Sequence, residues 1–290
     1  MIDETVHPND IRWRLSQIVT TTAGKVCFDV GGSGQPLVLV HGTPWSSFNW
    51  RHVAAALAPR FTVYVYDLPG YGQSDQFDGQ DVSLAAQGDV LAQLLAHWGL
   101  EQPVVVGHDF GGTTVLRAHL LHDCTYRKMI LVDPVALSPW GSSFFRQVRR
   151  HASLFAELPE TIHRAILTAY VQGATYRPLD DETREGILAP WLGAQGQPAF
   201  YRQIAQAEQR YTGEIEPLYA SVRCPTLILW GQEDRWIPVR RALDLQQRIP
   251  GSRLEILPQA GHLVQEDAPA LLVSHVLKFL HEPDVTTGAS

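Results

Sequence analysis

The chain has 290 residues, of which 45% are hydrophobic and 18% are charged, so it has the composition of a folded globular protein and not of a disordered or fibrous one. Its formal net charge of −7 argues against a nucleic-acid partner, because phosphate binding needs a concentrated lysine and arginine surface. The three widely spaced cysteines indicate neither a disulfide framework nor a metal site, and they predict a reducing, cytoplasmic location. We expect no signal peptide and no membrane span, because the N-terminus lacks a basic start and every apolar run is far shorter than about 20 residues.

Strands and helices alternate through the first half of the chain. A hairpin or meander is expected over residues 11–30. Short apolar or β-branched runs predict further strands, and apolar residues at helical spacing predict helices. In chain order, the expected strands are 36–40, 61–66, 103–106 and 129–132, and the expected helices are 50–57, 81–98 and 113–121.

The alternation stops at residues 136–219, where the pattern is helical and interrupted by proline and glycine. It resumes with expected strands at 225–230 and 253–257 and helices at 239–248 and 268–280. We therefore predict an α/β fold with a core domain (1–135 and 220–290) and a helical cap domain (136–219). The core is an open, mostly parallel sheet with helices on both faces. Because ligands bind such sheets beyond the carboxyl ends of the strands, the cap is expected to cover the site.

The strongest local motif is the run VGHDFGG at residues 106–112, which lies between a predicted strand and a predicted helix. Glycines two residues before and after a central residue permit a tight turn that lifts that residue over the sheet edge. This is the geometry of a nucleophile elbow, whose usual central residue is serine. Here the central residue is Asp109. An aspartate that only caps a helix would not need glycine at 107, 111 and 112, so Asp109 is the predicted nucleophile.

Two further segments complete a predicted catalytic site. The N–H of Thr43, after a His-Gly step at the end of the strand 36–40, would form a two-donor oxyanion hole with the N–H of Phe110. His262 follows the last strand and Asp234 the strand before it, in the order nucleophile, acid, histidine that this arrangement expects. We therefore assign His262 as the base and Asp234 as the residue that orients its imidazole.

Together these motifs resemble the α/β-hydrolase family over nearly the whole chain, from about residue 25 to 281. Within it, the chain resembles the aspartate-nucleophile branch, which holds epoxide hydrolases and haloalkane dehalogenases. The segments HGTPWSSFNWR (41–51) and GHDFGG (107–112) carry this match, and DLPGYGQS (67–74) is common to the wider family. The resemblance implies an eight-stranded, mostly parallel sheet. Some dehalogenases take the triad acid from the end of the strand before the cap, so Asp133 is an alternative to Asp234.

An aspartate nucleophile predicts chemistry at an sp³ carbon. A carboxylate, with a reference pKa near 3.9, is ionised at neutral pH and attacks without a base. Attack on an ester carbonyl would only give an anhydride, whereas attack on an alkyl carbon with a leaving group gives a stable ester. His262 would then activate water to hydrolyse that ester at the carboxyl carbon of Asp109. No metal or organic cofactor is implied, and the expected partners are a small hydrophobic substrate and water.

The leaving group separates the possible reactions. Opening an epoxide needs an acid, and epoxide hydrolases carry an aromatic-Tyr-Arg step late in the cap. The step Phe-Tyr-Arg at 200–202 is similar, which makes Tyr201 the candidate proton donor. The second cap tyrosine of that family has three stand-ins here, His151, Tyr170 and Tyr176.

A halide instead needs N–H donors. Haloalkane dehalogenases usually carry Trp after the nucleophile, many carry Asn after the His-Gly pair, and fluoroacetate dehalogenases carry Arg after the nucleophile. This chain has Phe110 and Thr43 at those positions. An epoxide hydrolase is therefore the leading prediction, a haloalkane dehalogenase is the alternative, and a non-hydrolytic ligand-binding or lyase member of the fold is the third. Trp45, Trp140 or Trp191 could supply such donors instead, but packing in the core or cap is the favoured interpretation of these residues. The expected apolar substrate pocket includes Trp45, His151 and Phe155.

Overall fold

The computed structural model describes residues 13–282, which are built around one eight-stranded sheet with the strand order β1-β2-β4-β3-β5-β6-β7-β8. The first two strands and β4 pair antiparallel, and all neighbours from β4 to β8 are parallel. This confirms the predicted mostly parallel sheet. Residues 11–12 of the expected hairpin lie outside the described part. The strands are β1 (Gln17–Thr21), β2 (Gly24–Gly32), β3 (Gln35–Val40), β4 (Phe61–Tyr66), β5 (Val104–His108), β6 (Lys128–Val132), β7 (Thr226–Gly231) and β8 (Arg253–Leu257).

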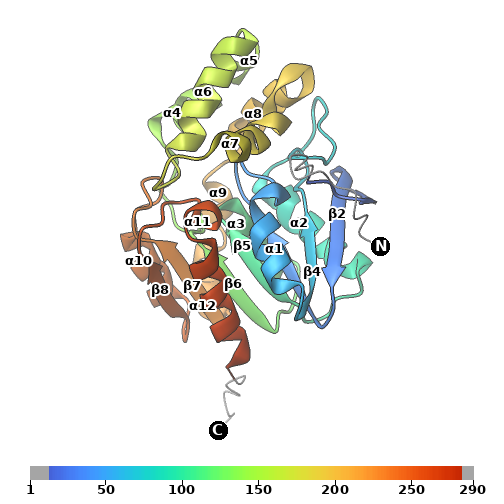
Figure 1. Ribbon diagram of the computed structural model, residues 1–290, viewed down its shortest axis with the longest axis vertical. Helices are drawn as coiled ribbons and strands as arrows, with labels where there is room; N and C mark the ends of the chain where they lie inside the picture. Colours follow the sequence, from blue (N-terminus) through green and yellow to red (C-terminus); the bar gives the residue numbers. More distant parts are fainter. Residues whose placement is uncertain (1–12, 283–290) are drawn as a thin grey trace.

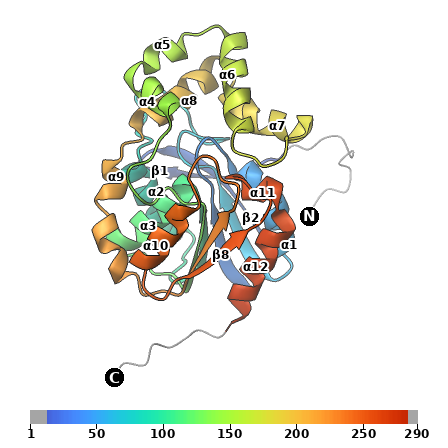
Figure 2. The same ribbon diagram turned by 90° about the vertical axis from the view of Figure 1, so that its left-hand side faces the viewer.

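Helices cover both faces of the sheet (Figures 1 and 2). On one face, α1 (Arg51–Leu57) contacts α12 (Pro269–His281). On the other, α2 (Leu84–His97) contacts α3 (Phe110–Leu121), and α10 (Arg240–Arg248) adds buried side chains to the same cluster. Two short segments precede α1 and α12, namely η1 (Ser47–Trp50) and α11 (Val264–Asp267).

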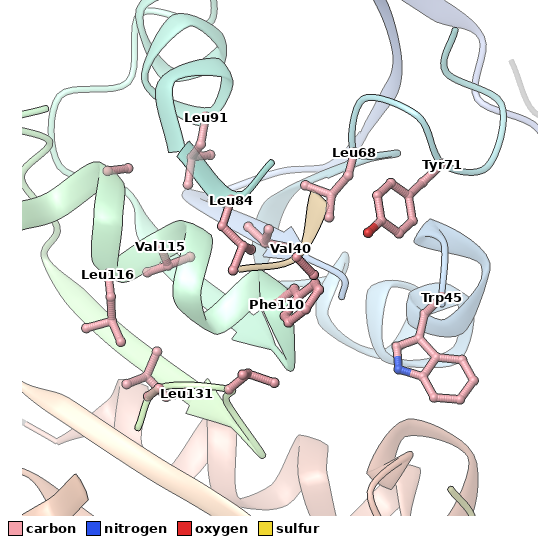
Figure 3. Close-up of a cluster of buried hydrophobic side chains, with 14 of the residues drawn as sticks. Val40, Trp45, Leu68, Tyr71, Leu84, Leu91, Phe110, Val115, Leu116 and Leu131 are labelled. Atoms are coloured by element: carbon pink, nitrogen blue, oxygen red, sulfur yellow. The ribbon is translucent and has the colours of Figure 1, made fainter. Parts of the chain in front are cut away.

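The hydrophobic core is split by the sheet into two clusters. Alternate residues of a strand point to opposite faces, so Val38 and Val40 of β3 pack with α2 and α3, whereas Leu37 and Leu39 pack with α1 and α12. Every residue of β5, β6 and β7 is buried, as expected for parallel strands covered on both sides. Figure 3 shows part of the first cluster, with Val40, Leu84 and Leu91, and Val115 and Leu116 of α3.

Two helix starts differ from the prediction for physical reasons. The helix expected from residue 81 begins at Leu84, because the side chain of Ser83 accepts the N–H of Ala86 and caps it. The helix expected from residue 113 begins already at Phe110, so it follows Asp109 directly. The latter difference matters for the site, because it places Asp109 immediately before the first turn of a helix.

The described chain between β6 and β7 is helical. Most of these helices gather at one end of the sheet (Figures 1 and 2). They touch the loops that follow two strands: the indole N–H of Trp191 donates to the carbonyl of Pro44, after β3, and the N–H of Leu263, after β8, donates to Ala174. We call these elements the helical insertion: α4 (Ser143–Arg150), α5 (Ala152–Ala156), α6 (Glu160–Gln172), α7 (Asp181–Leu188), η2 (Ala189–Trp191), α8 (Gly193–Gln206), α9 (Arg210–Gly213) and η3 (Glu216–Ser221). Across residues 13–282, no helix combines the length and apolar character needed to cross a membrane.

Candidate active site

Asp109 lies in a sharp turn between β5 and α3. Its backbone has φ 54° and ψ −120°, a strained conformation for a residue with a side chain. The turn is so tight that a Cβ on Gly107 would lie 2.6 Å from the carbonyl oxygen of Gly111. A Cβ on Gly111 would lie 2.2 Å from the carbonyl oxygen of Val40. The glycines of the motif are therefore required by close backbone approach, and the elbow geometry expected from the motif is present.

Asp109, His262 and Asp234 form a hydrogen-bonded chain. Nε2 of His262 lies 3.1 Å from Oδ2 of Asp109, and Nδ1 lies 2.8 Å from Oδ2 of Asp234. The second oxygen of Asp234 accepts the backbone N–H groups of Trp236 and Ile237 at 2.8 and 2.9 Å, which fixes the carboxylate. All three side chains are buried. The structure thus brings together the three residues that the sequence singles out as nucleophile, base and acid.

His262 is held as a cation by its two carboxylate neighbours. Burial by itself lowers the pKa of His262, but the charges and hydrogen bonds of Asp234 and Asp109 outweigh burial and raise the pKa well above its usual value. Both ring nitrogens are engaged by carboxylates, so the ring offers no free nitrogen to a metal ion. The pKa of His262 must fall whenever Asp109 loses its charge.

Asp133 lies beside this chain, at the end of β6. Its Oδ1 accepts the N–H of Gly231 at 2.8 Å, whereas its buried Oδ2 has no partner among the described residues. Side-chain oxygens of Asp133 and Asp234 and a ring nitrogen of His262 lie within 4.8 Å of one another. Burial and the charge of Asp234 raise the pKa of Asp133 well above its usual value, which favours the neutral form of Asp133. In this arrangement Asp234 is the acid that bonds to the imidazole.

Replacing Asp133 by asparagine is expected to flatten the pH dependence of stability. The raised pKa means that the folded state holds the proton of Asp133 more tightly than the unfolded state. The stability that this group contributes is therefore complete below its unfolded pKa and is lost as pH rises toward the folded pKa, at up to about 1.4 kcal/mol per pH unit. Asparagine keeps the acceptor for Gly231 without titrating. We therefore expect the unfolding temperature of Asp133→Asn to rise relative to that of the wild type as pH increases from 5 to 9.

Asp123→Asn provides the control for this measurement. Asp123 also has a positive φ angle, 54° against 41° for Asp133, but its side chain is exposed. The control variant should follow the wild-type pH dependence. If the unfolding temperatures of the wild type and Asp133→Asn changed in parallel across this range, the raised pKa of Asp133 would be contradicted.

One oxygen of Asp109 is held by the loop after β3. The backbone N–H of Thr43 donates to Oδ1 of Asp109 at 2.6 Å. A Cβ on Gly42 would lie 2.3 Å from that same oxygen, so glycine is needed for the loop to come this close. The second predicted donor, Phe110, is the first residue of α3, where a backbone N–H has no intrahelical acceptor. Oδ1 is therefore the oxygen placed to carry charge, and Oδ2 is the oxygen shared with His262.

The sequence alone does not reveal Gln203 of α8, which anchors the loop that carries Thr43. Its Oε1 accepts the hydroxyl of Thr43 at 2.7 Å and the hydroxyl of Tyr71 at 3.1 Å. Gln203 is buried. The helical insertion thus helps to position the N–H that binds Asp109.

A cavity of about 120 Å³ opens onto Asp109. Its walls come from both the sheet edge and the helical insertion, and they are mostly apolar. Arg235 is the one basic residue in its wall among the described residues. The other side chains of note are Thr43, Phe110, Val135, Trp140, Phe145, Tyr170, Trp236 and Ile237. Such a lining suits a hydrophobic ligand with few polar groups.

Tyr170 brings a free hydroxyl group to this cavity. Its ring stacks on Trp236 with 4.6 Å between centroids, and Trp236 packs on His262 at 5.1 Å. Within residues 13–282, the hydroxyl group of Tyr170 has no hydrogen-bond partner. Burial, and then the charge of Asp109, raises the pKa of Tyr170, so the phenol keeps its proton. In the sequence, Tyr170 is one of three candidates for the second cap tyrosine. The only sequence signal for Trp236 is its position two residues after Asp234.

Tyr201 lies elsewhere, inside the helical insertion. Its hydroxyl is 2.9 Å from Nδ1 of His163, whose Nε2 is 2.8 Å from the carbonyl oxygen of Trp191. A carbonyl can only accept, so Nε2 carries the ring proton and Nδ1 accepts the proton of Tyr201. Burial lowers the pKa of His163, which keeps the ring neutral. Because Trp191 in turn donates to Pro44, this buried chain fastens the insertion to the loop after β3.

The three residues of the expected substrate pocket are not in the cavity wall. Trp45 stacks on the far side of Trp236, with 5.5 Å between centroids. His151 joins α4 to α5 and is exposed, and Phe155 packs against Tyr201. The apolar character expected of the pocket comes instead from the end of β6 and from α4, α6 and the loop after β7.

Comparison with known proteins identifies the family. The family model for the alpha/beta hydrolase fold matches residues 35–269. The chain belongs to the α/β-hydrolase fold family and is a hydrolase of this fold.

Three similar proteins span nearly the whole chain. A solved alpha/beta hydrolase fold protein from Burkholderia ambifaria is 46% identical, with a TM-score of 0.89, and the match covers 91% of this chain and 98% of that one. Haloalkane dehalogenase 2 of Mycobacterium tuberculosis is 24% identical over 95% of this chain and 96% of its own length. The solved epoxide hydrolase CorEH, at 20% identity, shares the fold with a TM-score of 0.72 over 91% of this chain and 97% of its own.

Proposed function

We propose that this hydrolase opens hydrophobic epoxides to diols through a covalent ester on Asp109. The observation that carries the proposal is the carboxylate at the elbow. Its Oδ1 accepts the N–H of Thr43, its Oδ2 lies 3.1 Å from Nε2 of His262, and Asp109 lines a mostly apolar cavity. A carboxylate in this position forms a stable intermediate only when it attacks an alkyl carbon.

In the first step, Oδ2 of Asp109 attacks a ring carbon, the carbon–oxygen bond of the epoxide breaks, and the electron pair moves to the departing oxygen. That oxygen needs one proton. Tyr170 has an unpartnered hydroxyl in the wall of the same cavity, so Tyr170 is the donor that we propose, in place of Tyr201. Ester formation removes the charge of Asp109, which lowers the pKa of His262. The proton that His262 then releases replaces the one taken from Tyr170.

In the second step, neutral His262 takes a proton from a water molecule, and the hydroxide formed attacks the carboxyl carbon of Asp109. The charge that develops on Oδ1 is stabilised by the N–H of Thr43, which already donates to this atom. Asp234 stabilises the imidazolium that forms. The ester bond breaks, and the departing alkoxide takes the proton of the hydroxyl group that was added to the carboxyl carbon. The diol then leaves with its new oxygen from Asp109, and the triad returns to its starting charges.

A single-turnover reaction in ¹⁸O-water tests this mechanism. With the enzyme in excess over an aryl epoxide, the first diol should contain unlabelled oxygen from Asp109, and the label should enter the carboxyl group of Asp109. Direct appearance of label in the first diol would show attack by water on the substrate and would overturn the proposal.

The proton donor is tested by removing one hydroxyl group at a time. Tyr170→Phe should slow formation of the ester from an epoxide by about 10²-fold, the usual scale of general acid catalysis. Tyr201→Phe is the matched control, because that hydroxyl is bound to His163, and it should leave this step unchanged. If only Tyr201→Phe slowed ester formation, Tyr201 and not Tyr170 would be the proton donor.

A haloalkane dehalogenase is the second candidate. It is supported by the 24% identity to haloalkane dehalogenase 2, and by Trp236, which lines the cavity and whose indole N–H has no hydrogen-bond partner in residues 13–282. A halide leaves without a proton, so Tyr170→Phe would not slow its release. Halide release from bromoalkanes at a rate above that of epoxide opening would select this candidate.

A further inference from the structure

We propose that Arg235 and Arg240 form a subsite for a carboxylate, so that the preferred substrate is an apolar chain with the reactive carbon at one end and an acid group at the other. The identity of the reactive group rests on the proposed function. Binding of a carboxylate by the two arginines does not depend on that reaction. Arg235 carries the argument because it lies in the wall of the cavity that also holds Asp109.

A second hollow adjoins the cavity over Asp109. This hollow has a volume of about 380 Å³, and it shares Val135, Trp140, Arg235 and Trp236 with the walls of the first. Ile237 also lines both. The residues that separate the nucleophile from the second hollow are thus mostly apolar, and Arg235 borders both hollows.

The second hollow is basic although the whole chain is acidic. Three arginines line it, Arg235, Arg240 and Arg241, and among the described residues no carboxylate does. Arg241 donates to the backbone carbonyls of Ser138 and Pro139 and so has a structural role. In the part of the chain that the structure describes, Arg235 and Arg240 make no hydrogen bond or ion pair. Two exposed arginines thus line the hollow with their hydrogen-bond donors unused within the described residues.

The position of Arg240 adds to this charge. It is the first residue of α10, which has no acidic residue in its first turn. The positive end of a helix is an unfavourable place for a cation unless an anion is nearby. A carboxylate in the hollow would be attracted by both guanidinium groups, and each planar group can bind it through two parallel N–H bonds.

The substrate class follows from this combination. A neutral alkyl epoxide would contact only the apolar walls, and the two arginines would stay solvated. An epoxide that carries a carboxylic acid would contact the apolar walls and also bind the arginines. Phe110 occupies the position after the nucleophile, so no guanidinium lies next to the reacting carbon at that position. The acid group is therefore separated from the reactive carbon by an apolar chain.

Turnover of a matched pair of substrates tests the subsite. The pair is the terminal epoxide of an octenoic acid and that of the corresponding octenamide, which differ only in charge. The wild type should prefer the acid by about tenfold in kcat/KM, and salt should reduce this preference by screening. In Arg235→Gln/Arg240→Gln the preference should disappear, because turnover of the acid should fall by about tenfold more than turnover of the amide. Equal rates for the two substrates in the wild type, or equal losses for both in the variant, would overturn the subsite.

A binding experiment separates the subsite from the chemistry. Octanoate and octanamide carry no reactive carbon, so their binding, measured by calorimetry, does not depend on an ester at Asp109. Octanoate should bind about tenfold more tightly than octanamide, and only in proteins that retain Arg235 and Arg240. Arg60→Gln is the control. Arg60 is exposed and directly precedes β4, so it lies at the amino ends of the parallel strands, whereas Asp109 lies beyond their carboxyl ends. Selective octanoate binding without any ester would support the subsite and refute the epoxide reaction, whereas ester formation without that selectivity would do the reverse.

Discussion

The Asp109→Asn variant is expected to lose at least about 10⁴-fold in initial turnover, the scale on which removing a nucleophile acts in other hydrolases. Asparagine fits the same space and keeps an acceptor for the N–H of Thr43, so the elbow should remain folded. A neutral amide, however, is a poor nucleophile towards an alkyl carbon. The measurement is the initial rate of product formation from an epoxide and from a bromoalkane.

Asp109→Ala is the companion variant. It has no side-chain oxygen, so it should be inactive both initially and after long incubation. Both variants should unfold near the wild-type temperature, which would show that the loss is chemical. An Asp109→Asn protein with an initial rate within tenfold of the wild type would remove Asp109 as the nucleophile and with it both alkyl-transfer reactions.

The His262→Gln variant is expected to stop after the first step and to accumulate the ester. Asp109 needs no base to attack a bromoalkane, but hydrolysis of the ester needs the imidazole to take a proton from water. Intact-protein mass spectrometry should show a gain equal to the alkyl group of a bromoalkane less one hydrogen, or to the whole mass of an epoxide. Fragmentation should place the added mass on Asp109.

The double variant Asp109→Asn/His262→Gln is the control for that trapping experiment and should gain no mass. A mass gain in the double variant would show labelling of another side chain. No gain in His262→Gln with any reactive epoxide or bromoalkane would contradict the covalent mechanism.

The sheet and the triad could be predicted because local sequence determines them. The strands 36–40 and 61–66 are short apolar runs, and parallel strands bring the residues that follow them to one edge. The turn at Asp109 needs glycines at fixed spacing, and this need is visible in the sequence. These features depend on a few neighbouring residues and on chain order alone.

The wall of the cavity could not be predicted in the same way. Tyr201 and Gln203 are two residues apart on α8, so their side chains point in nearly opposite directions. The structure directs Gln203 towards Thr43 and Tyr201 towards His163. Which side of α8 faces the sheet is decided by contacts with α4, α5 and α6, and no local pattern in residues 200–202 contains that information.

The fixed position of Asp109 also determines the stereochemistry of the proposed reaction. The turn and the N–H of Thr43 hold one oxygen in place, so the other approaches the substrate from a single side. Water attacks the carboxyl carbon of the enzyme, and the substrate carbon therefore undergoes only one displacement. A chiral epoxide should yield a diol whose configuration is inverted at the attacked carbon, and a cyclic epoxide should yield the trans diol.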